Sequence, residues 1–170
     1  VASSQEGDIA LAHNGDIVNA DAIRKELKKK GWAFITTTDT EVMIRLLADE
    51  FSNDRDLGRS VRNLMRKIVG SYSMVVLLKN RILAIRDPQG IKPLCLGKLP
   101  DDAGFIVASE TVALDVVNAT FIRDIEPGET LIIGKGGLTS LKQAQTKRKA
   151  FCIFEYIYFA RPDSNIFTKN

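Results

Sequence analysis

The sequence has few of the residues that most often bind metals or act as redox groups. It contains one histidine, His13, and two cysteines, Cys95 and Cys152, which lie far apart and form no C-x-x-C pair. Zinc sites use clustered cysteines and histidines, so we predict no metal site. A Ser-His-Asp triad would have to rest on His13 alone, which argues against that class of hydrolase.

Long apolar stretches and a signal sequence are also absent. No apolar run approaches the roughly 20 residues that a membrane-spanning helix needs. The first residues, Val1 to Glu6, lack the basic and apolar regions of a secretory signal. We therefore expect no membrane contact and a cytoplasmic location.

The charge is nearly balanced, with 24 lysines and arginines against 21 aspartates and glutamates and a net charge of +3. Part of the basic excess lies in one run, from Lys142 to Lys149. Such runs are usually solvated, and no aromatic residues lie within this one to stack on bases. We expect no nucleic-acid partner.

The sequence does contain amphipathic segments followed by short apolar ones. Its 170 residues, 45% of them hydrophobic, suffice for one domain with a core. Helical spacing predicts helices at 19–30, 41–51 and 57–69. Strands are then predicted at 71–78, 81–86, 92–97, 105–109, 119–122, 130–133 and 138–141, with a short helix at 110–117. This order indicates an α+β protein with at least one large antiparallel sheet.

One predicted strand has apolar residues at consecutive positions. Val75, Val76 and Leu77 would place apolar side chains on both faces of the strand at 71–78. Such a run is typical of a strand that is buried on both sides, as in a layered sandwich.

The stretch Ala12-His13-Asn14-Gly15-Asp16 lies between an apolar segment and the first predicted helix. We expect the strand before it to stop at Asn14 and Gly15. Two interpretations remain open for this pair. Asn-Gly is a common hairpin turn. A side-chain amide beside a closely approachable backbone N–H is also suited to bind developing negative charge on a carbonyl oxygen.

A second polar stretch, Thr36 to Glu41, precedes the second predicted helix. Asp39 or Thr40 is expected to be the N-cap of that helix. A carboxylate at this place can also hold the ammonium group of a ligand, with one oxygen capping the helix and the other pointing outward. Both roles stay open for Asp39.

The end of the sequence is rich in aromatic residues. Five of them fall within nine positions at the start of the segment from Phe151 to Ser164. This segment is either a last core strand or a join to another domain.

These stretches together resemble a known family. HNG at 13–15 with Asn19 downstream, followed by TDTE at 38–41, resembles the class II glutamine amidotransferases. RDPQGIKPL at 86–94, ASET at 108–111 and FEYIYFARPDS at 154–164 are similar to the amidophosphoribosyltransferase branch of that family. The motifs occur in family order across essentially the whole chain.

The resemblance implies a four-layer αββα sandwich of two antiparallel sheets, of the N-terminal-nucleophile hydrolase type. In such enzymes an N-terminal cysteine attacks the side-chain amide of glutamine and releases ammonia. A phosphoribosyltransferase domain then uses the ammonia to make phosphoribosylamine from phosphoribosyl pyrophosphate in purine synthesis. By position, Asn14 and Gly15 would form the oxyanion hole, and Asp39 would hold the α-ammonium of glutamine.

The resemblance also implies an organisation and partners. Residues 1–150 would be the glutaminase domain lacking its N-terminal segment. Residues 151–170 would be its C-terminal end and the start of the join to a missing phosphoribosyltransferase domain. No cofactor is expected in this chain, Mg²⁺ is expected in the transferase domain, and the full enzyme is expected to be a homo-oligomer. Cys152 lies where some members use a cysteine as an iron–sulfur ligand, so the sequence leaves open whether a cluster is present.

Two further residues are expected to have structural roles only. His13 is expected to be structural, and Cys95 to be a core thiol.

The start of the chain departs from the family pattern. Members of the family begin with cysteine and use an arginine before the Asn-Gly pair to bind the substrate carboxylate, whereas this chain begins with Val1 and has no arginine before Arg24. We therefore expect this chain to hydrolyse no glutamine. The alternatives are the glutaminase domain of another class II amidotransferase and a non-catalytic glutamine-binding or interaction module of the same fold.

Overall fold

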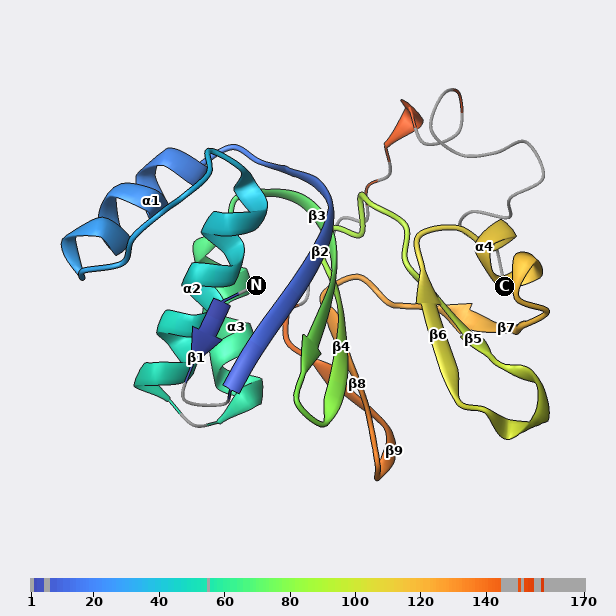
Figure 1. Ribbon diagram of the computed structural model, residues 1–170. Coiled ribbons are helices and arrows are strands. Elements are labelled where there is room, and N and C mark those ends of the chain that lie inside the picture. The colour runs from blue at the N-terminus through green and yellow to red at the C-terminus, as the bar shows by residue number, and fades with distance from the viewer. Residues whose placement is uncertain are drawn as a thin grey trace.

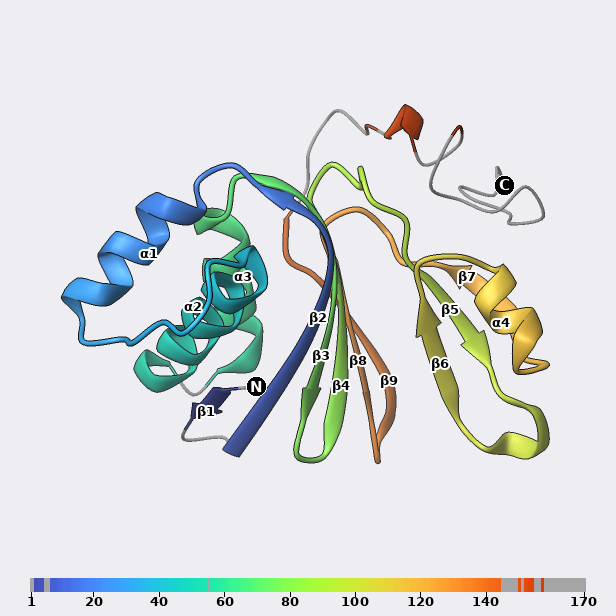
Figure 2. The same ribbon diagram turned by 45° about the horizontal axis from the view of Figure 1, so that its top comes forward.

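The computed structural model describes residues 2–4, 7–54, 56–144, 150, 152–154 and 157, and its elements stack in four layers. Figure 2 shows a layer of three helices, a first sheet, a second sheet and a short helix following one another across the molecule. The predicted αββα sandwich is therefore confirmed. The helices are α1 (Ala20–Lys29), α2 (Asp39–Asn53), α3 (Leu57–Lys67) and α4 (Val112–Val116), with a 3₁₀ turn, η1, at Pro100–Asp102.

The first sheet has the strand order β1-β2-β3-β4-β8-β9 and the second the order β6-β5-β7, and the pairing is antiparallel throughout. In Figure 1 the long strand β2 runs beside β3, with α1 to α3 on one side of the sheet. The strands are β1 (Ala2–Ser4), β2 (Gly7–Ile17), β3 (Gly70–Leu78), β4 (Arg81–Arg86), β5 (Cys95–Lys98), β6 (Phe105–Ala108), β7 (Thr120–Asp124), β8 (Glu129–Gly134) and β9 (Gly137–Lys142).

Three clusters of buried apolar side chains fill the three spaces between the layers. Met74 and Val76 of β3 belong to the cluster under the helices, and Val75 packs into the cluster between the sheets, around Leu96 and Leu131. A third, smaller cluster joins the second sheet to α4. The alternation along β3 follows from the period of two in a strand, so one strand contributes to two cores.

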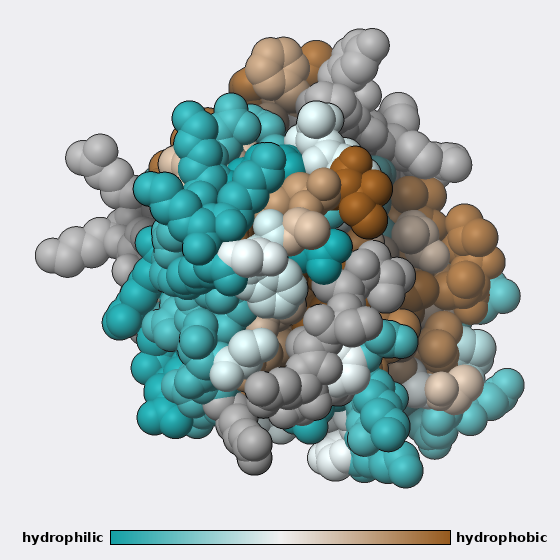
Figure 3. Space-filling model, turned by 60° about the vertical axis from the view of Figure 1, so that its left-hand side comes forward, coloured by the Kyte–Doolittle hydropathy of each residue, from teal (hydrophilic) through white to brown (hydrophobic). Residues whose placement is uncertain are grey.

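The outer face of α1 is strongly polar. Lys25 and Lys28 are exposed there, whereas Ile23 and Leu27 on the other side of the helix are buried. Figure 3 looks onto the side of the molecule that carries α1, where hydrophilic side chains cover a broad area. This is the amphipathic pattern expected for residues 19–30.

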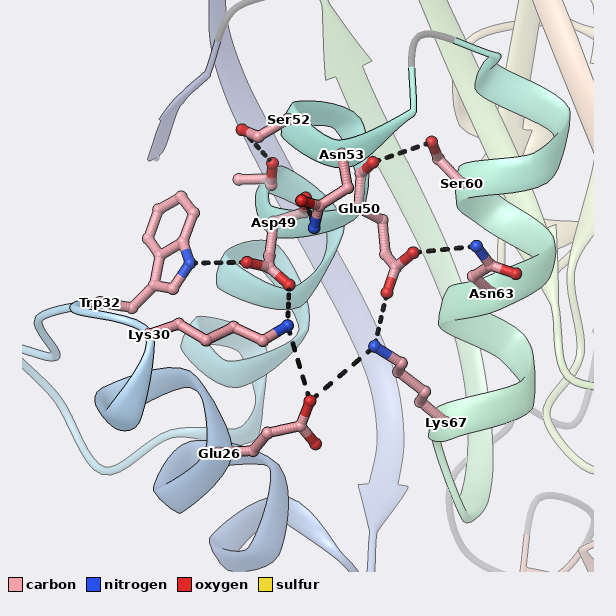
Figure 4. A network of polar contacts seen from close by, with 11 residues as sticks. Glu26, Lys30, Trp32, Asp49, Glu50, Ser52, Asn53, Ser60, Asn63 and Lys67 are labelled. Atoms are coloured by element: carbon pink, nitrogen blue, oxygen red, sulfur yellow. Dashed lines mark hydrogen bonds and ion pairs between the residues drawn. The ribbon is translucent and has the colours of Figure 1, made fainter.

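A network of charged side chains, in which Asp49 and Glu50 are buried, joins the three helices of this layer (Figure 4). Asp49 of α2 accepts hydrogen bonds from Lys30 Nζ at 2.6 Å and from Trp32 Nε1 at 3.0 Å. Glu50, the next residue of α2, forms an ion pair of 2.7 Å with Lys67 at the end of α3. The network therefore fixes the C-terminal end of α1 and the residues after it against α2.

Two expectations about the elements were incomplete. The strand β1 was not predicted, because three residues show no periodicity. Leu77 is 54% exposed, so the prediction that 75–77 is buried on both faces is wrong at that residue. The side chains of the first sheet that pack against the second sheet are Val75, Ala84, Leu131 and Ile133, and this contact ends before Leu77.

Parts of the predicted organisation fall outside the described residues. Of the aromatic segment 151–164 and the join at 151–170, only residues 152–154 and 157 are described, and of the basic run 142–149 only residues 142–144. Over the described part of the chain, no helix is long and apolar enough to cross a bilayer.

Candidate functional site

Asn14 and Gly15 lie inside a strand rather than at a turn. β2 continues to Ile17 and pairs with β3, with Asn14 opposite Ser73 and Gly15 opposite Tyr72. The hairpin interpretation is therefore wrong, and so is the expectation that the strand stops at Asn14 and Gly15. The strand continues because β3 supplies pairing partners along this whole stretch.

Gly15 departs from ordinary strand geometry. Its φ is +136°, and a Cβ at this position would collide with the carbonyl oxygen of Ser71. Gly70 on β3 has a φ of +155°, and a Cβ there would collide with the carbonyl oxygen of Asp16. The two strands thus approach each other through two glycines, and no other residue type fits at Gly15 unless the backbone moves.

The N–H group of Gly15 lies on the open edge of β2. The Ile17 N–H points away from β3 and donates to Asp39 Oδ2 at 3.1 Å, whereas the N–H of the next residue donates to Val69 O on the β3 side at 2.9 Å. Because N–H groups alternate between the two edges of a strand, the Gly15 N–H shares an edge with that of Ile17. β1 pairs only with the first three residues of β2, so in the described part of the chain no strand covers this edge at Gly15.

Asp39 is the first residue of α2, and it does not cap the helix. The N-cap is Thr38, whose hydroxyl accepts a hydrogen bond from the Glu41 N–H at 3.3 Å. The prediction of Asp39 or Thr40 as N-cap is therefore wrong. One oxygen of Asp39 is bonded to β2 instead, and a carboxylate held at one oxygen can meet a cationic group of a ligand with the other.

The side chain of Asn14 projects from the face of the first sheet that looks toward the second sheet. Tyr72 and Met74 pack among the helices, so the alternate residue Ser73 faces the other way, and Asn14, its partner across the strands, does the same. Asn14 is only half-buried. Its amide and the Gly15 N–H are thus adjacent donors at one end of β2.

The loop after β4 lies at the same end of the sheet. Ser73 pairs with Asn14 on one side and with Arg86 on the other. The buried guanidinium of Arg86 donates to the carbonyl oxygens of Gly90 and Lys92 at 2.9 Å each, and to that of Ile125 at 2.6 Å. Arg86 belongs to a family motif, but its role could not be predicted, because three bonds to backbone carbonyls leave no pattern in a sequence.

Asp87 organises this loop from within. Its buried carboxylate accepts hydrogen bonds at 2.8 to 3.4 Å from the backbone N–H groups of Gln89, Gly90, Ile91 and Lys92. Side chains of aspartate commonly bond the backbone just after them. Arg86 and Asp87 therefore fix the carbonyls and the N–H groups of one loop at the same end of the first sheet as Asn14.

His13 directly precedes Asn14 and Gly15 on β2, and its imidazole is neutral at neutral pH. Burial lowers the pKa of its imidazole below the ordinary value, against the raising effect of the Asp39 and Asp16 carboxylates. Its Nε2 is buried without a hydrogen-bond partner within the described residues. A neutral ring opposite Met74 agrees with a structural role rather than that of a base.

The cysteines do not form a metal centre by themselves. Burial raises the pKa of the Cys95 thiol to about 12, which keeps it protonated and unreactive at neutral pH. Cys152 is half-buried and free. Where the chain is described, no three histidine, cysteine, aspartate or glutamate residues lie together as a metal site would require.

The chain is similar to glutamine amidotransferases over most of its length. The sequence model of the family described as a glutamine amidotransferase domain matches residues 1–116. The amidophosphoribosyltransferase of Archaeoglobus fulgidus is 45% identical over 166 residues, which are 98% of this chain and 36% of that protein. The amidophosphoribosyltransferase of Methanothermobacter thermautotrophicus is 46% identical over 98% of this chain and 35% of its own length.

A solved structure shows the same likeness in three dimensions. The glutamine phosphoribosylpyrophosphate amidotransferase of B. subtilis, complexed with ADP and GMP, matches with a TM-score of 0.88 and 39% identity. The match covers 98% of this chain and 36% of that one. The chain thus spans about a third of the length of the relatives that it matches.

Proposed function

Because the chain belongs to the family of glutamine amidotransferase domains, we propose that it is the glutaminase domain of an amidophosphoribosyltransferase. In this role it binds glutamine, whose side-chain amide supplies the ammonia that converts phosphoribosyl pyrophosphate to phosphoribosylamine in purine synthesis. The similarity to amidophosphoribosyltransferases over 98% of the chain supports this branch over other class II amidotransferases.

The observation that carries the proposal is the bond between Asp39 and the edge of β2. Asp39 meets the strand at Ile17, two residues beyond Gly15, which corresponds to about 7 Å along a strand. That separation is comparable with the length of a glutamine molecule. The α-ammonium would lie at Asp39 while the side-chain carbonyl oxygen lies at the N–H of Gly15 and the amide of Asn14.

The negative charge that develops on the amide and the positive charge of the ammonium give each of these residues a role. A nucleophile that attacks the glutamine amide places negative charge on the carbonyl oxygen, and each positioned donor stabilises that charge by roughly 3 kcal/mol. Asn14 and Gly15 are these donors. Asp39 pairs with the ammonium and orients the substrate before the attack.

The nucleophile is neither of the two cysteines in the sequence. Cys95 is buried and protonated, and neither it nor Cys152 carries a free α-amino group to act as the base. We propose that residues 1–170 on their own bind glutamine without hydrolysing it.

The wider organisation follows the same proposal. Residues 1–150 are the glutaminase domain, and residues 151–170 lead to a phosphoribosyltransferase domain that binds Mg²⁺ and receives the ammonia. The full enzyme is a cytoplasmic homo-oligomer. Whether Cys152 contributes to an iron–sulfur cluster depends on ligands from outside the described residues.

A glutamine titration of residues 1–170, followed by amide NMR, tests this proposal. We expect saturable shifts at Gly15 and Ile17. Asp39→Asn should weaken binding roughly tenfold or more, because it removes a charge-assisted contact. Asn14→Ala should change ground-state binding little, because its amide acts mainly on the charge of the transition state.

An exposed acid on α1 provides the control. Asp21→Asn makes the same charge change at an exposed helical position and should leave glutamine binding unchanged. Absence of saturable binding would overturn the proposal, and ammonia release by residues 1–170 alone would overturn the part that concerns hydrolysis.

A further inference from the structure

The loop from Trp32 to Thr38 leads directly into Asp39. Trp32 and Phe34 pack against the core beneath the helices, and polar contacts hold the rest of the loop, residues 35–38. None of its residues lies in a helix or strand, and the side chain of Ile35 is 88% exposed. A hollow of about 290 Å³ lies between the loop, β2 and α2. It is lined by Leu11, Ile35, Thr36, Thr38, Thr40, Glu41, Ile44 and Arg45.

Glu41 holds the loop from α2. Its carboxylate accepts hydrogen bonds from the Ile35 N–H at 2.9 Å, from the Thr36 N–H at 2.6 Å and from the Thr36 hydroxyl at 2.7 Å. Burial raises the pKa of this carboxyl, but these hydrogen bonds together with Arg45 outweigh burial and lower it to about 2. Glu41 is therefore ionised at neutral pH, and its bonds to the loop are charge-assisted.

Arg24 holds the same loop from α1. Its Nη1 donates to Thr36 O at 2.7 Å and its Nη2 to Thr38 O at 3.3 Å. The centre of the guanidinium lies 4.7 Å from the centroid of the Phe34 ring, within the range of a cation–π contact. A lysine could not reproduce this set, because it lacks the planar fork that bonds two carbonyls at once.

We propose that Arg24 and Glu41 are positioning residues that set the affinity of Asp39 for a ligand ammonium group, an inference that rests on the proposed function. Thr36 is held at its N–H by Glu41 and at its carbonyl by Arg24. The carbonyl of Thr38, the N-cap of α2, is held by Arg24.

The ammonium contact at Asp39 and the amide contact at Asn14 and Gly15 are held by different parts of the structure. Asp39 begins α2 directly after this loop, whose residues Thr36 and Thr38 are held by Arg24 and Glu41, a pair that we call the clamp. The place of the Asp39 carboxylate at β2 therefore depends on the clamp. The donors of Asn14 and Gly15 belong to a paired strand and do not depend on it. Loosening the clamp therefore weakens the recognition of ammonium and leaves the recognition of the amide intact.

Two ligands and three variants of α1 test the inference. Glutamine carries the α-ammonium, and 4-carbamoylbutanoate is the same molecule without it. Arg24→Gln should weaken glutamine binding roughly three- to tenfold and leave 4-carbamoylbutanoate unchanged, and Arg24→Lys should restore part of the loss. Lys25→Gln removes a neighbouring exposed charge and should change neither affinity.

Amide hydrogen exchange gives a readout that needs no ligand. The Ile35 and Thr36 N–H groups bond to Glu41, so they should exchange at least several-fold faster in Arg24→Gln than in Lys25→Gln. Unchanged exchange would overturn the clamp.

The ligand results separate this inference from the proposed function. If the unsubstituted chain binds no glutamine, the proposed function fails and the inference fails with it. If the chain binds glutamine but Arg24→Gln weakens both ligands equally, or neither, only the inference is overturned, because a general structural role would then explain Arg24.

Discussion

Gly15 is the residue at which the geometry of the site leaves least freedom. A Cβ there would collide with Ser71 O, and the φ of +136° is unfavourable for any other residue. Gly15→Ala should therefore lower the free energy of unfolding by about 2–4 kcal/mol, as measured by urea denaturation. Gly136→Ala, at a position where a Cβ would have no neighbour within 4 Å, should change it by less than about 0.5 kcal/mol.

The two thiols should differ sharply in reactivity. Cys95 is 2% exposed and burial raises its pKa to about 12, whereas Cys152 is half-buried. With iodoacetamide at a pH of about 8, we expect one label per native chain, at Cys152, and a second only after denaturation. Two labels on the native protein, counted by mass spectrometry, would contradict the burial of Cys95.

At the scale of residues, the sequence identified the candidate site but not its geometry. Asn14, Gly15 and Asp39 were predicted through the order of family motifs. Asp39 is held at β2 by a hydrogen bond that the Ile17 N–H donates to its carboxylate, between residues 22 positions apart, which no local pattern encodes. The N-cap was misplaced because Thr38, Asp39 and Thr40 are all residue types that cap helices.

At the scale of elements, Arg86 holds the loop that follows β4 to the end of that strand. It is 3% exposed, and it satisfies three carbonyl oxygens. Arg86→Met should therefore lower the free energy of unfolding by about 3–5 kcal/mol, since these carbonyls would lose their donor in the interior. Arg81→Met, at the exposed start of the same strand, should cost less than about 0.5 kcal/mol in the same denaturation experiment.

The charge network gives the attachment of α1 a dependence on pH. The hydrogen bond to Asp49 raises the pKa of Lys30 above its ordinary 10.5. A raised pKa in the folded state means that the ion pair contributes stability below that ordinary value and loses it as the pH rises through the raised one. The Trp32 indole, which also bonds to Asp49, should therefore change its fluorescence above a pH of about 10.5.

A matched pair of variants separates this effect from general alkaline unfolding. Lys30→Met should remove the change in Trp32 fluorescence, because no ammonium is left to lose its proton. Lys28→Met, an exposed position on the same helix, should keep it. Identical profiles for the two variants would show that Lys30 does not fix this end of α1.

The elements themselves could largely be predicted because their periodicity is local. The strand at 81–86 was placed correctly, and the three long helices were located within a few residues. The strand predicted at 92–97 begins only at Cys95. Arg86 donates to the Lys92 carbonyl oxygen and Asp87 accepts from the Lys92 N–H, so tertiary contacts override the pattern at the start of this segment.

At the scale of the whole molecule, the division into two sheets was not contained in the strand pattern. The strands β4 and β5 belong to different sheets although only the loop at 87–94 separates them. The pattern of helices followed by strands indicated α+β, and the four layers were expected only through the resemblance. The reason is that the Arg86–Asp87 loop directs the chain from one sheet to the other, and this is a property of its three-dimensional contacts.

The second sheet covers only part of the first, and the exposed fractions of three leucines show the difference. Leu83 lies at 0% exposure between the first sheet and the helices, and Leu96 at 0% between the sheets, whereas Leu77 is 54% exposed on the part of β3 that the second sheet does not cover. Leu83→Ala and Leu96→Ala should each lower the free energy of unfolding by about 2–5 kcal/mol, because each opens a cavity. Leu77→Ala should lower it by less than about 1 kcal/mol, because little area leaves the interior. A loss at Leu77 as large as that at Leu96, measured by urea denaturation of residues 1–170, would mean that another surface covers this face in solution.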